Sequence, residues 1–407
     1  MEPQIIRAII VCALGYFIDV FDIQLFAVLR VPSLTDLGVP ADKLAVVGGN
    51  ILNAQMLGMV LGGFLWGWLG DRFGRLKSLY GSILIYSLGT LACSFAPDPL
   101  IYGALRFITG FGLAGEVGAA ITLLAELMPP LKRGWGIVIA AGFGFLGPAA
   151  AVISSWFIEW RTSYIIAGVL GLLLLVLRIK LSEPELFRKV AANQNKGGSW
   201  TLLAQRKQGV SFLYCFMIGL PIMYGWILLN FFSMEFSHAV LKQGETFNQK
   251  VCLLAFYIGT SFGDVLCGTL SQIWKSRRKA MASILLLGLV TAALFLIYGP
   301  YAKITALALY IIYFFLGIAA GGWILFIMIT PEHFGTNIRA TTAIVVSNLG
   351  RGLSIPMIFS FQWLQEFMND TNAAAVLGVL FYIAAFAALR KLNETHGLDL
   401  DYIEKYE

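Results

Sequence analysis

Six ionisable side chains lie inside long apolar stretches of the sequence, and they are the first candidates for chemistry. A charge in the middle of a bilayer costs at least about 2.5–3.5 kcal/mol on insertion scales, so each one requires a partner or a function. Buried carboxylates can carry protons, and a guanidinium keeps its charge and binds carboxylates through paired hydrogen bonds. The six residues are Asp19, Asp22, Arg106, Glu116, Asp264 and Arg351.

The stretches around these residues have the length and composition of membrane-spanning helices. Hydrophobic residues make up 58% of the 407 residues and charged residues 13%, which excludes a water-soluble enzyme, a disordered chain and a nucleic-acid-binding domain. A bilayer core needs about 20 apolar residues per helix, and continuous runs of this length are helices rather than barrel strands. We predict twelve spans, at 5–29, 44–69, 77–96, 100–126, 135–158, 162–181, 209–235, 248–273, 279–298, 303–329, 338–363 and 372–391.

Basic residues gather at alternate ends of these spans. Of the 29 Lys and Arg residues, 21 fall in the loops and ends of one side, including 70–77, 127–134 and 178–208, and 6 fall on the other side. Because cytoplasmic loops carry the excess, we predict that both termini are cytoplasmic. The net charge of +6 then needs no nucleic-acid partner. The first span has no small-residue cleavage site, and we expect it to be retained.

The cysteines and histidines show no metal-binding pattern. Five cysteines and three histidines are dispersed along the chain, without a CxxC pair or a histidine cluster. We therefore expect no metal, no disulfide framework and no cofactor. The sequence also has no nucleotide-binding loop and no catalytic cluster at a membrane edge, which disfavours an ATP-driven pump and a membrane enzyme.

The predicted spans form two halves that resemble each other. Glu126 precedes Arg133 by seven residues after span four, and Glu332 precedes Arg339 by seven residues after span ten. Parallel six-span repeats build transporters whose binding site lies between the halves near the membrane midplane. We therefore predict an all-α integral membrane protein with two pseudo-symmetric six-helix bundles. The predicted domains are an N-terminal bundle 1–181, a cytoplasmic linker 182–208, a C-terminal bundle 209–391 and a cytoplasmic tail 392–407.

Several segments carry a family resemblance. Residues 67–77, Gly-Trp-Leu-Gly-Asp-Arg-Phe-Gly-Arg-Leu-Lys, resemble the signature loop of the major facilitator superfamily. Three segments are similar to the metabolite:proton symporter family: residues 15–22, Gly115-Glu116 with residues 126–134, and residues 332–341 with 348–350 and Pro356. Gly335 stands where that family usually has proline. The resemblance implies the twelve-helix major facilitator fold and transport by alternating access.

Four of the buried charges are candidates for proton coupling. Asp22 and Arg106 lie about 10 and 9 Å from the outer ends of spans one and four at 1.5 Å per residue, so we expect them to pair. In sugar-porter-like relatives the corresponding pair is a proton switch; a permanent structural ion pair is the alternative. Burial raises the pKa of a carboxylate and a nearby Arg lowers it, so departure of Arg would load a proton. Asp19 and Glu116 are further proton carriers or cavity contacts, and an interhelical hydrogen bond is the alternative for Glu116.

A second group could bind a substrate. Arg351 lies about 20 Å deep in span eleven, and it is either an anion-binding residue or the counter-ion of a buried acid. Asn348 lies one turn before it. Asn230 and Tyr224 of span seven and Trp323 of span ten could complete a cavity, with ordinary packing as the alternative.

Residues at the cytoplasmic ends could form gates. In the superfamily, the aspartate at the end of span two accepts hydrogen bonds from the start of span eleven, where the helix dipole favours negative charge. We expect Asp264 to act in gating or interhelical pairing. Lys275, Arg277, Arg278 and Lys279 fit ordinary positive-inside anchoring. The candidate gating residues are Asp71, Arg72, Arg75, Glu126, Arg133, Asp264, Glu332 and Arg339.

Together these features predict a monomeric carrier of the bacterial inner membrane. We expect proton-coupled uptake of a small organic acid, an amino acid or another zwitterionic metabolite, driven by the proton gradient. The alternative is a proton-coupled antiporter that exports a drug-like or metabolite substrate, because residues 142–148 partly resemble the antiporter motif, although Ala150 and Ala151 depart from it. A receptor built on a carrier fold would bind its ligand without counterflow.

Overall fold

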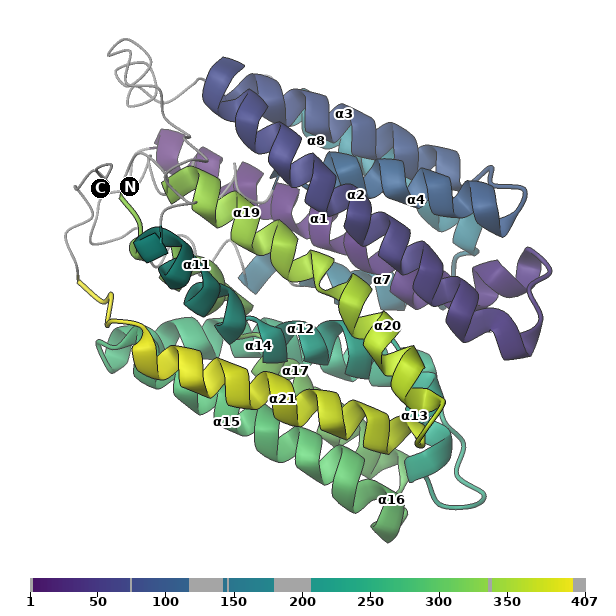
Figure 1. The fold of residues 1–407 in the computed structure, drawn as a ribbon. Coiled ribbons are helices and arrows are strands. Elements are labelled where there is room, and N and C mark those ends of the chain that lie inside the picture. Colours follow the sequence, from purple (N-terminus) through teal and green to yellow (C-terminus); the bar gives the residue numbers. More distant parts are fainter. Residues whose placement is uncertain are drawn as a thin grey trace. The chain divides into compact units, whose positions relative to one another are not determined.

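A computed structural model describes residues 3–73, 75–116, 142–144, 146–178, 206–335 and 339–397. These residues form helices joined by turns, and no β-strand occurs among them (Figure 1). Each of the twelve predicted spans contains helix in its described part. Within the described ranges, eight helices are long and apolar enough to cross a membrane, and three apolar helices are shorter. The prediction of an all-α membrane fold is confirmed.

The helices fall into two compact units. Unit 1 comprises Met1–Gln205, Phe334–Gly352 and Asp401–Glu407, and unit 2 comprises Arg206–His333 and Leu353–Leu400. Most of the predicted linker and tail lie outside the described residues. The predicted domain boundaries therefore stay a prediction.

Unit 1 is built on a series of four packed helices, in the order α2, α4, α3 and α8. α2 (Leu44–Phe73) packs against α4 (Pro99–Leu113) and α19 (Arg339–Gly352), and α3 (Arg75–Cys93) packs against α4 and α8 (Trp160–Arg178). α1 (Pro3–Asp36) packs against α7 (Leu146–Ser154) and α8. α4 begins at a capped end, because the Asp98 carboxylate accepts hydrogen bonds from two backbone N–H groups at 2.9 Å.

The first span is longer than the sequence predicts. We expected residues 30–43 to form an outer loop, but α1 continues to Asp36 and its Arg30 is only 1% exposed. A Cβ at Gly48 of α2 would lie 2.6 Å from Cδ of Arg30. Because Gly48 has no side chain, the aliphatic part of Arg30 can pack against α2. This contact explains how Arg30 of α1 is buried.

Unit 2 contains several interrupted helices. Span seven consists of α11 (Arg206–Ile218), α12 (Leu220–Met223), a π-helical turn η2 (Tyr224–Asn230) and α13 (Ser233–Val240). Pro221 lacks a backbone donor, and π-helical turns inside α-helices are frequent at functional sites. The other elements are α14 (Gln249–Ile273), α15 (Arg277–Ala293), the π-helical η3 (Leu294–Tyr298), α16 (Gly299–Ala302), α17 (Ala306–Ala320), α18 (Trp323–Glu332), α20 (Ser354–Gln365) and α21 (Asp370–Lys391).

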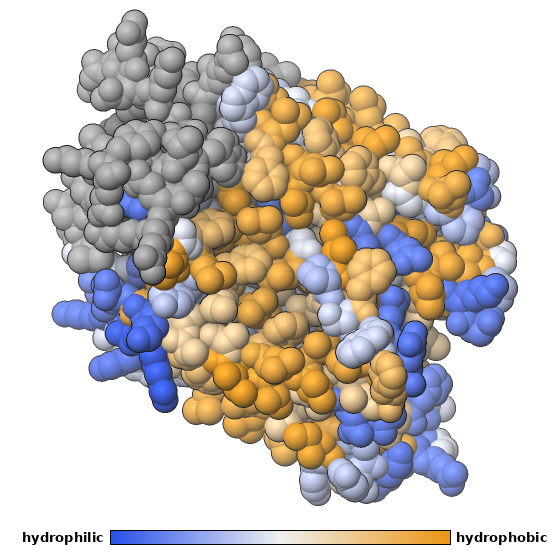
Figure 2. All heavy atoms as spheres, viewed as in Figure 1, coloured by the Kyte–Doolittle hydropathy of each residue, from blue (hydrophilic) through white to orange (hydrophobic). Residues whose placement is uncertain are grey.

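The outer faces of the helices are apolar. On α2 the large exposed side chains Leu57, Leu61, Phe64 and Trp68 recur every three or four residues and so share one face. Figure 2 shows broad areas of hydrophobic residues over the described helices. Such a surface suits contact with lipid rather than water. All five cysteines are buried.

Candidate functional site

A buried ion pair joins the first and fourth spans in unit 1. Arg106 of α4 places Nη1 3.1 Å from Oδ1 of Asp22 on α1, and the two side chains are 0% and 1% exposed. Nη2 of Arg106 also donates to the backbone carbonyl of Asp22 at 3.1 Å. The structure therefore brings together the two residues whose matching depths predicted a pair.

Three neighbouring helices supply further partners of this pair, two through hydrogen bonds and one through an aromatic ring. The Thr90 hydroxyl of α3 donates to Oδ2 of Asp22, and Nε of Arg106 donates to Oε1 of Gln55 on α2 at 3.3 Å. The guanidinium also lies 5.5 Å from the ring centroid of Tyr164 on α8, which favours a cation–π contact. Removing either charge would leave the other buried and uncompensated.

A second group of charges surrounds the end of α4. Nη2 of Arg178 on α8 lies 2.6 Å from Oε1 of Glu116, and both side chains are almost fully buried. The approach is an ion pair without aligned hydrogen bonds. The Asp19 carboxylate is 0% exposed, and neither oxygen has a hydrogen-bond partner among the described residues. The charges that act on it are Glu116, Arg178 and Arg351.

The two predicted substrate residues of span eleven lie in unit 1. Arg351 of α19 is 9% exposed and interacts electrostatically with Asp19 and Tyr16 of α1. Nδ2 of Asn348 donates to the backbone carbonyl of Ala114 at 3.2 Å. Asn348 thus stabilises the carbonyl at the point where α4 ends, and Arg351 lies among the charges that gather there.

The tenth span is interrupted at the equivalent place in unit 2. α17 ends at Ala320 and α18 begins at Trp323, after Gly321 and Gly322. Oδ1 of Asp264 on α14 accepts a hydrogen bond from the backbone N–H of Ile324 at 3.2 Å. Nε1 of Trp226 donates to the carbonyl of Ala320 at 3.3 Å. The interhelical role that we predicted for Asp264 agrees with this contact, while its gating role stays a prediction.

The remaining predicted substrate residues lie buried in unit 2. The Tyr224 hydroxyl donates to the carbonyl of Ala374 at 2.7 Å, and Nδ2 of Asn230 lies 3.2 Å from the Tyr257 hydroxyl. Trp323 packs against Phe326, with ring centroids 5.2 Å apart. These contacts hold the side chains in place, and their substrate role stays a prediction.

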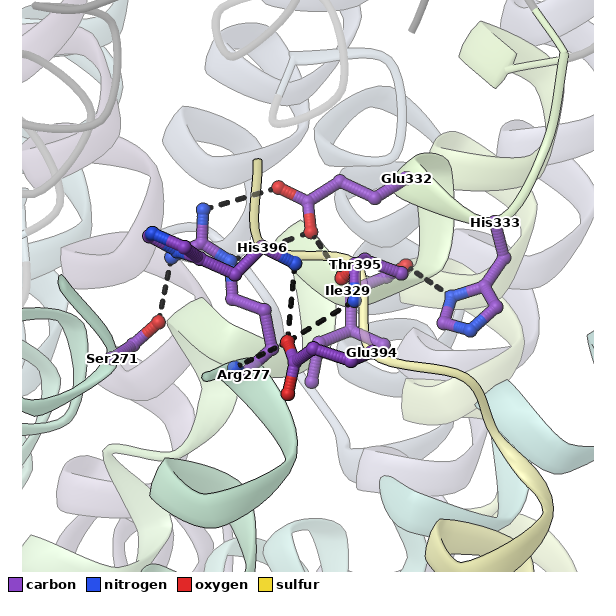
Figure 3. Close-up of polar contacts among 8 residues, drawn as sticks. All are labelled: Ser271, Arg277, Ile329, Glu332, His333, Glu394, Thr395 and His396. Atoms are coloured by element: carbon purple, nitrogen blue, oxygen red, sulfur yellow. Dashed lines mark hydrogen bonds and ion pairs between the residues drawn. The ribbon is translucent and has the colours of Figure 1, made fainter. Parts of the chain in front are cut away.

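A polar cluster fastens the chain after the last span in unit 2 (Figure 3). Arg277, at the start of α15, lies 3.2 Å from Oε1 of Glu332 and 2.6 Å from Oγ of Ser271. Glu394 accepts hydrogen bonds from the Ser276 hydroxyl and from the backbone N–H of Arg277 at 2.7 Å. Partial burial raises the pKa of Glu394, but these hydrogen bonds outweigh it and hold the pKa below its ordinary value.

This cluster differs from the sequence prediction at one residue. We expected Arg277 to contribute only positive charge at the membrane surface, but its side chain is 8% exposed and has specific partners. Glu332, a predicted gating residue, is its partner. The side chains of the other gating candidates lie outside the described residues; they are Asp71, Arg72, Arg75, Glu126, Arg133 and Arg339.

Sequence analysis missed Arg178. It was counted among the basic residues at the cytoplasmic side, but it lies in α8 and is 2% exposed. A signal was present, because Arg178 follows the start of its helix at Trp160 by 18 residues, and Glu116 follows Pro99 by 17. Two residues at equal depth in the membrane can pair only if their helices are neighbours, and the sequence does not show that α4 and α8 are neighbours. Gln55 and Thr90 gave no comparable signal.

The fold and the buried charges define a multi-pass membrane transport protein. The chain belongs to the Major Facilitator Superfamily, whose family model matches residues 12–359. It is therefore a transporter rather than an enzyme, and a protein of the bacterial inner membrane. The predicted superfamily membership and fold class are confirmed.

Individual relatives support the same assignment. The chain is 27% identical to a niacin transporter of Acinetobacter baylyi, over 97% of this chain and 95% of the relative. It is 28% identical to a gentisate transporter of Corynebacterium glutamicum, over 74% and 69% of the two chains. Its fold is similar to that of the xylose transporter XylE from E. coli, with a TM-score of 0.75, 16% identity and coverage of 98% and 100%.

Proposed function

We propose that this protein takes up small carboxylic acids together with protons, and that ring acids with one carboxylate are its principal substrates. Membership of the superfamily supports transport of a small molecule. Relatives named as transporters of niacin, gentisate and gallate support the substrate class. These three compounds share an aromatic ring with a single carboxyl group.

The observation that carries the proton coupling is the buried pair of Asp22 and Arg106. The pair is neutral while it is closed, with its charges at 3.1 Å and almost no exposure. If alternating access separates the two helices, Asp22 is left without its counter-ion, and a buried carboxylate in that position favours the neutral, protonated form. A solved structure of similar fold is named as a D-xylose-proton symporter, so proteins of this fold include one that is coupled to protons.

Arg351 is the residue that supports recognition of a carboxylate. Its planar guanidinium binds a carboxylate through two parallel hydrogen bonds, which lysine does not reproduce. Arg351→Lys is therefore expected to weaken uptake although the charge is kept. The protein works as a monomer in this proposal, because each chain contains both bundles of the fold.

Uptake into proteoliposomes tests the function. An imposed inward proton gradient is expected to accumulate labelled nicotinate or gentisate, and a protonophore is expected to abolish accumulation. Asp22→Asn is expected to lose accumulation and to retain counterflow, since exchange needs no net proton movement. Asp36→Asn, on the same helix but 52% exposed at its side chain, is the matched control.

The direction of flux separates the two transport classes. Accumulation driven by an outward-directed proton gradient would support the antiporter alternative. Binding of the acids without any counterflow would support a receptor. Accumulation in Asp22→Asn equal to that of the unchanged protein would contradict the role given to the buried pair.

A further inference from the structure

Glu116 and Arg178 meet against a gap in the first helix. A Cβ at Gly15 would overlap the Arg178 guanidinium and would lie 2.9 Å from Oε1 of Glu116. Glycine at this position therefore lets the ion pair lie directly against the backbone of α1. Asp19 follows Gly15 by four residues, so its side chain points from the same helix face. The pair from α4 and α8 is thus brought beside a third ionisable group.

A side chain of a neighbouring helix also fixes the backbone of Arg178. The Tyr80 hydroxyl on α3 donates to the carbonyl of Arg178 at 3.1 Å. The ion pair with Glu116 then sets the direction of the guanidinium. Since both partners are buried, the pair is screened little by solvent and its geometry matters more than at a surface.

The charges around Asp19 balance as a set. The set contains two carboxylates, Asp19 and Glu116, and two guanidiniums, Arg178 and Arg351; Glu116 and Arg178 form an ion pair, and both guanidiniums act electrostatically on Asp19. Asp22 is outside this balance because Arg106 neutralises it. The other titratable groups beside the set are Tyr86 of α3, and Tyr16 and Cys12 of α1 itself.

A bound carboxylate would disturb this balance. An anion at Arg351 adds one negative charge to a buried group that is otherwise neutral, and an uncompensated buried charge is costly. A proton on the Asp19–Glu116 pair restores neutrality. Asp19 is the residue suited to hold it, because Glu116 already has a guanidinium at 2.6 Å and Asp19 is fully buried beside the Glu116 carboxylate.

We propose that Asp19, Glu116, Arg178 and Arg351 form a substrate-linked proton site, in which Arg178 positions Glu116 and a substrate carboxylate at Arg351 enters with a proton on Asp19. This inference rests on the proposed function, because it needs a carboxylate substrate. It adds Arg178 and Gly15 to the working residues, and it places a proton site in the binding step itself. By reciprocity, the proton must then tighten binding of the acid as much as the acid tightens binding of the proton.

Proton uptake on binding tests this proposal with the purified full-length protein. Titration calorimetry with nicotinate, in buffers of different ionisation enthalpy, is expected to show uptake of about one proton per bound acid. Asp19→Asn is expected to bind nicotinate with almost no proton uptake and with an affinity that hardly changes with pH. Asp36→Asn, exposed on the same helix, is the matched control and keeps the uptake.

Arg178 is tested by the pH profile of binding. When the positive charge of Arg178 is removed, the set has one carboxylate in excess. Arg178→Gln is therefore expected to weaken nicotinate binding about tenfold near neutral pH, and the affinity is expected to recover in acid, where that carboxylate is protonated. Arg178→Lys keeps the charge and should keep the pH profile of the unchanged protein. A purely structural role of Arg178 would lower binding equally at every pH. Circular dichroism and size-exclusion profiles establish that each variant is folded.

The outcomes separate this inference from the proposed function. Unchanged proton uptake in Asp19→Asn, or an unaltered pH profile in Arg178→Gln, would overturn the proton site while counterflow of the acids still supports the transporter. Failure of nicotinate, gentisate and gallate all to bind the unchanged protein would overturn the substrate class and this inference with it.

Discussion

The fourth and tenth spans are interrupted at equivalent positions, yet the two interruptions are stabilised differently. The carbonyl of Ala114 in unit 1 accepts a hydrogen bond from Asn348, and the carbonyl of Ala320 in unit 2 accepts one from Trp226. α4 and α17 are each followed by a two-residue turn, Ala114-Gly115 and Gly321-Gly322, but the next residue is Glu116 in unit 1 and Trp323 in unit 2. The repeat therefore keeps the break and changes its chemistry.

This difference separates the tasks of the two units. In unit 1 the break introduces a carboxylate, and buried guanidiniums surround it. In unit 2 the break is surrounded by aromatic rings and neutral polar groups, with Asp264 accepting from the backbone of α18. At the breaks, unit 1 thus has a carboxylate paired with an arginine, whereas unit 2 has aromatic rings and a carboxylate that accepts from the backbone.

The largest expected difference in stability lies between the polar pairs of the two units. Arg106→Leu leaves Asp22 buried without a counter-ion, and it is expected to lower the unfolding free energy by about 3–5 kcal/mol. Asn230→Leu removes only a neutral partner of the Tyr257 hydroxyl, and we expect a loss of about 1–3 kcal/mol. Thermal unfolding of the purified variants measures both.

A second substitution tests the origin of the Arg106 effect. Adding Asp22→Asn to Arg106→Leu removes the orphaned charge and should recover part of the lost stability. Equal losses in Arg106→Leu and Asn230→Leu would remove the contrast between the charged pair of unit 1 and the neutral pair of unit 2.

The two glycines at the breaks should differ in their tolerance of a methyl group. A Cβ at Gly321 would lie 2.6 Å from backbone atoms of α14. These atoms can move only if the whole helix shifts. A Cβ at Gly115 would meet side chains instead, with Cβ of Ser82 at 2.7 Å. We expect Gly321→Ala to cost about 1–3 kcal/mol and Gly115→Ala to cost less.

Thermal unfolding also measures the glycine pair. Ser82→Gly should relieve part of the cost of Gly115→Ala, because it removes two of the atoms that the new methyl group meets; Cγ of Trp66, at 2.9 Å, remains. No equivalent side-chain change should relieve Gly321→Ala. A larger loss at Gly115 than at Gly321 would show that the break in unit 1 is the more rigid one.

Asp264 should depend on its acceptor oxygen more than on its charge. Asp264→Asn retains an oxygen for the N–H of Ile324, so we expect a change below about 1 kcal/mol. Asp264→Leu leaves that N–H without an acceptor, and we expect a loss of about 1–3 kcal/mol. If Asp264→Asn is as damaging as Asp264→Leu, unit 2 also relies on a buried charge.

The smallest expected effect concerns Glu394 after the last span. Its hydrogen bonds hold its pKa below the ordinary value of 4.5. Their stabilisation is therefore fully present above the unfolded-state pKa, and it is lost as the pH falls through the folded-state pKa. Glu394→Gln should lower the melting temperature slightly at neutral pH, and the difference should shrink in acid; an equal difference at every pH would contradict this account. Glu366→Gln, an exposed glutamate in the same unit, is the control.

Much of the fold could be predicted from composition and charge. Continuous apolar runs require helices in a bilayer, and the signature residues 67–77 indicated the superfamily. The breaks at Ala114 and Gly321 were not predicted, because apolarity continues across them and hydropathy does not register a change of backbone direction. The π-helical turn after Pro221 was not predicted either, because the residues that form it are as apolar as those of an ordinary span.

The candidate site was predicted only where depth along one helix was sufficient. Asp22 and Arg106 were paired from their distances to the helix ends, and the structure places them at 3.1 Å. Arg178 was assigned to the membrane surface, because a basic residue in the last turn of a span resembles a topological signal. Its partner Glu116 could be identified only once α8, α1 and the end of α4 were placed together.

The burial of Cys12 offers a way to follow the protein as it works. This thiol is 2% exposed and lies beside the Arg178 and Glu116 charges on α1. A small thiol reagent can reach it only when water enters between the helices of unit 1. The rate at which Cys12 is alkylated would therefore measure how often unit 1 opens to water. A substrate that favours the closed state should lower this alkylation rate.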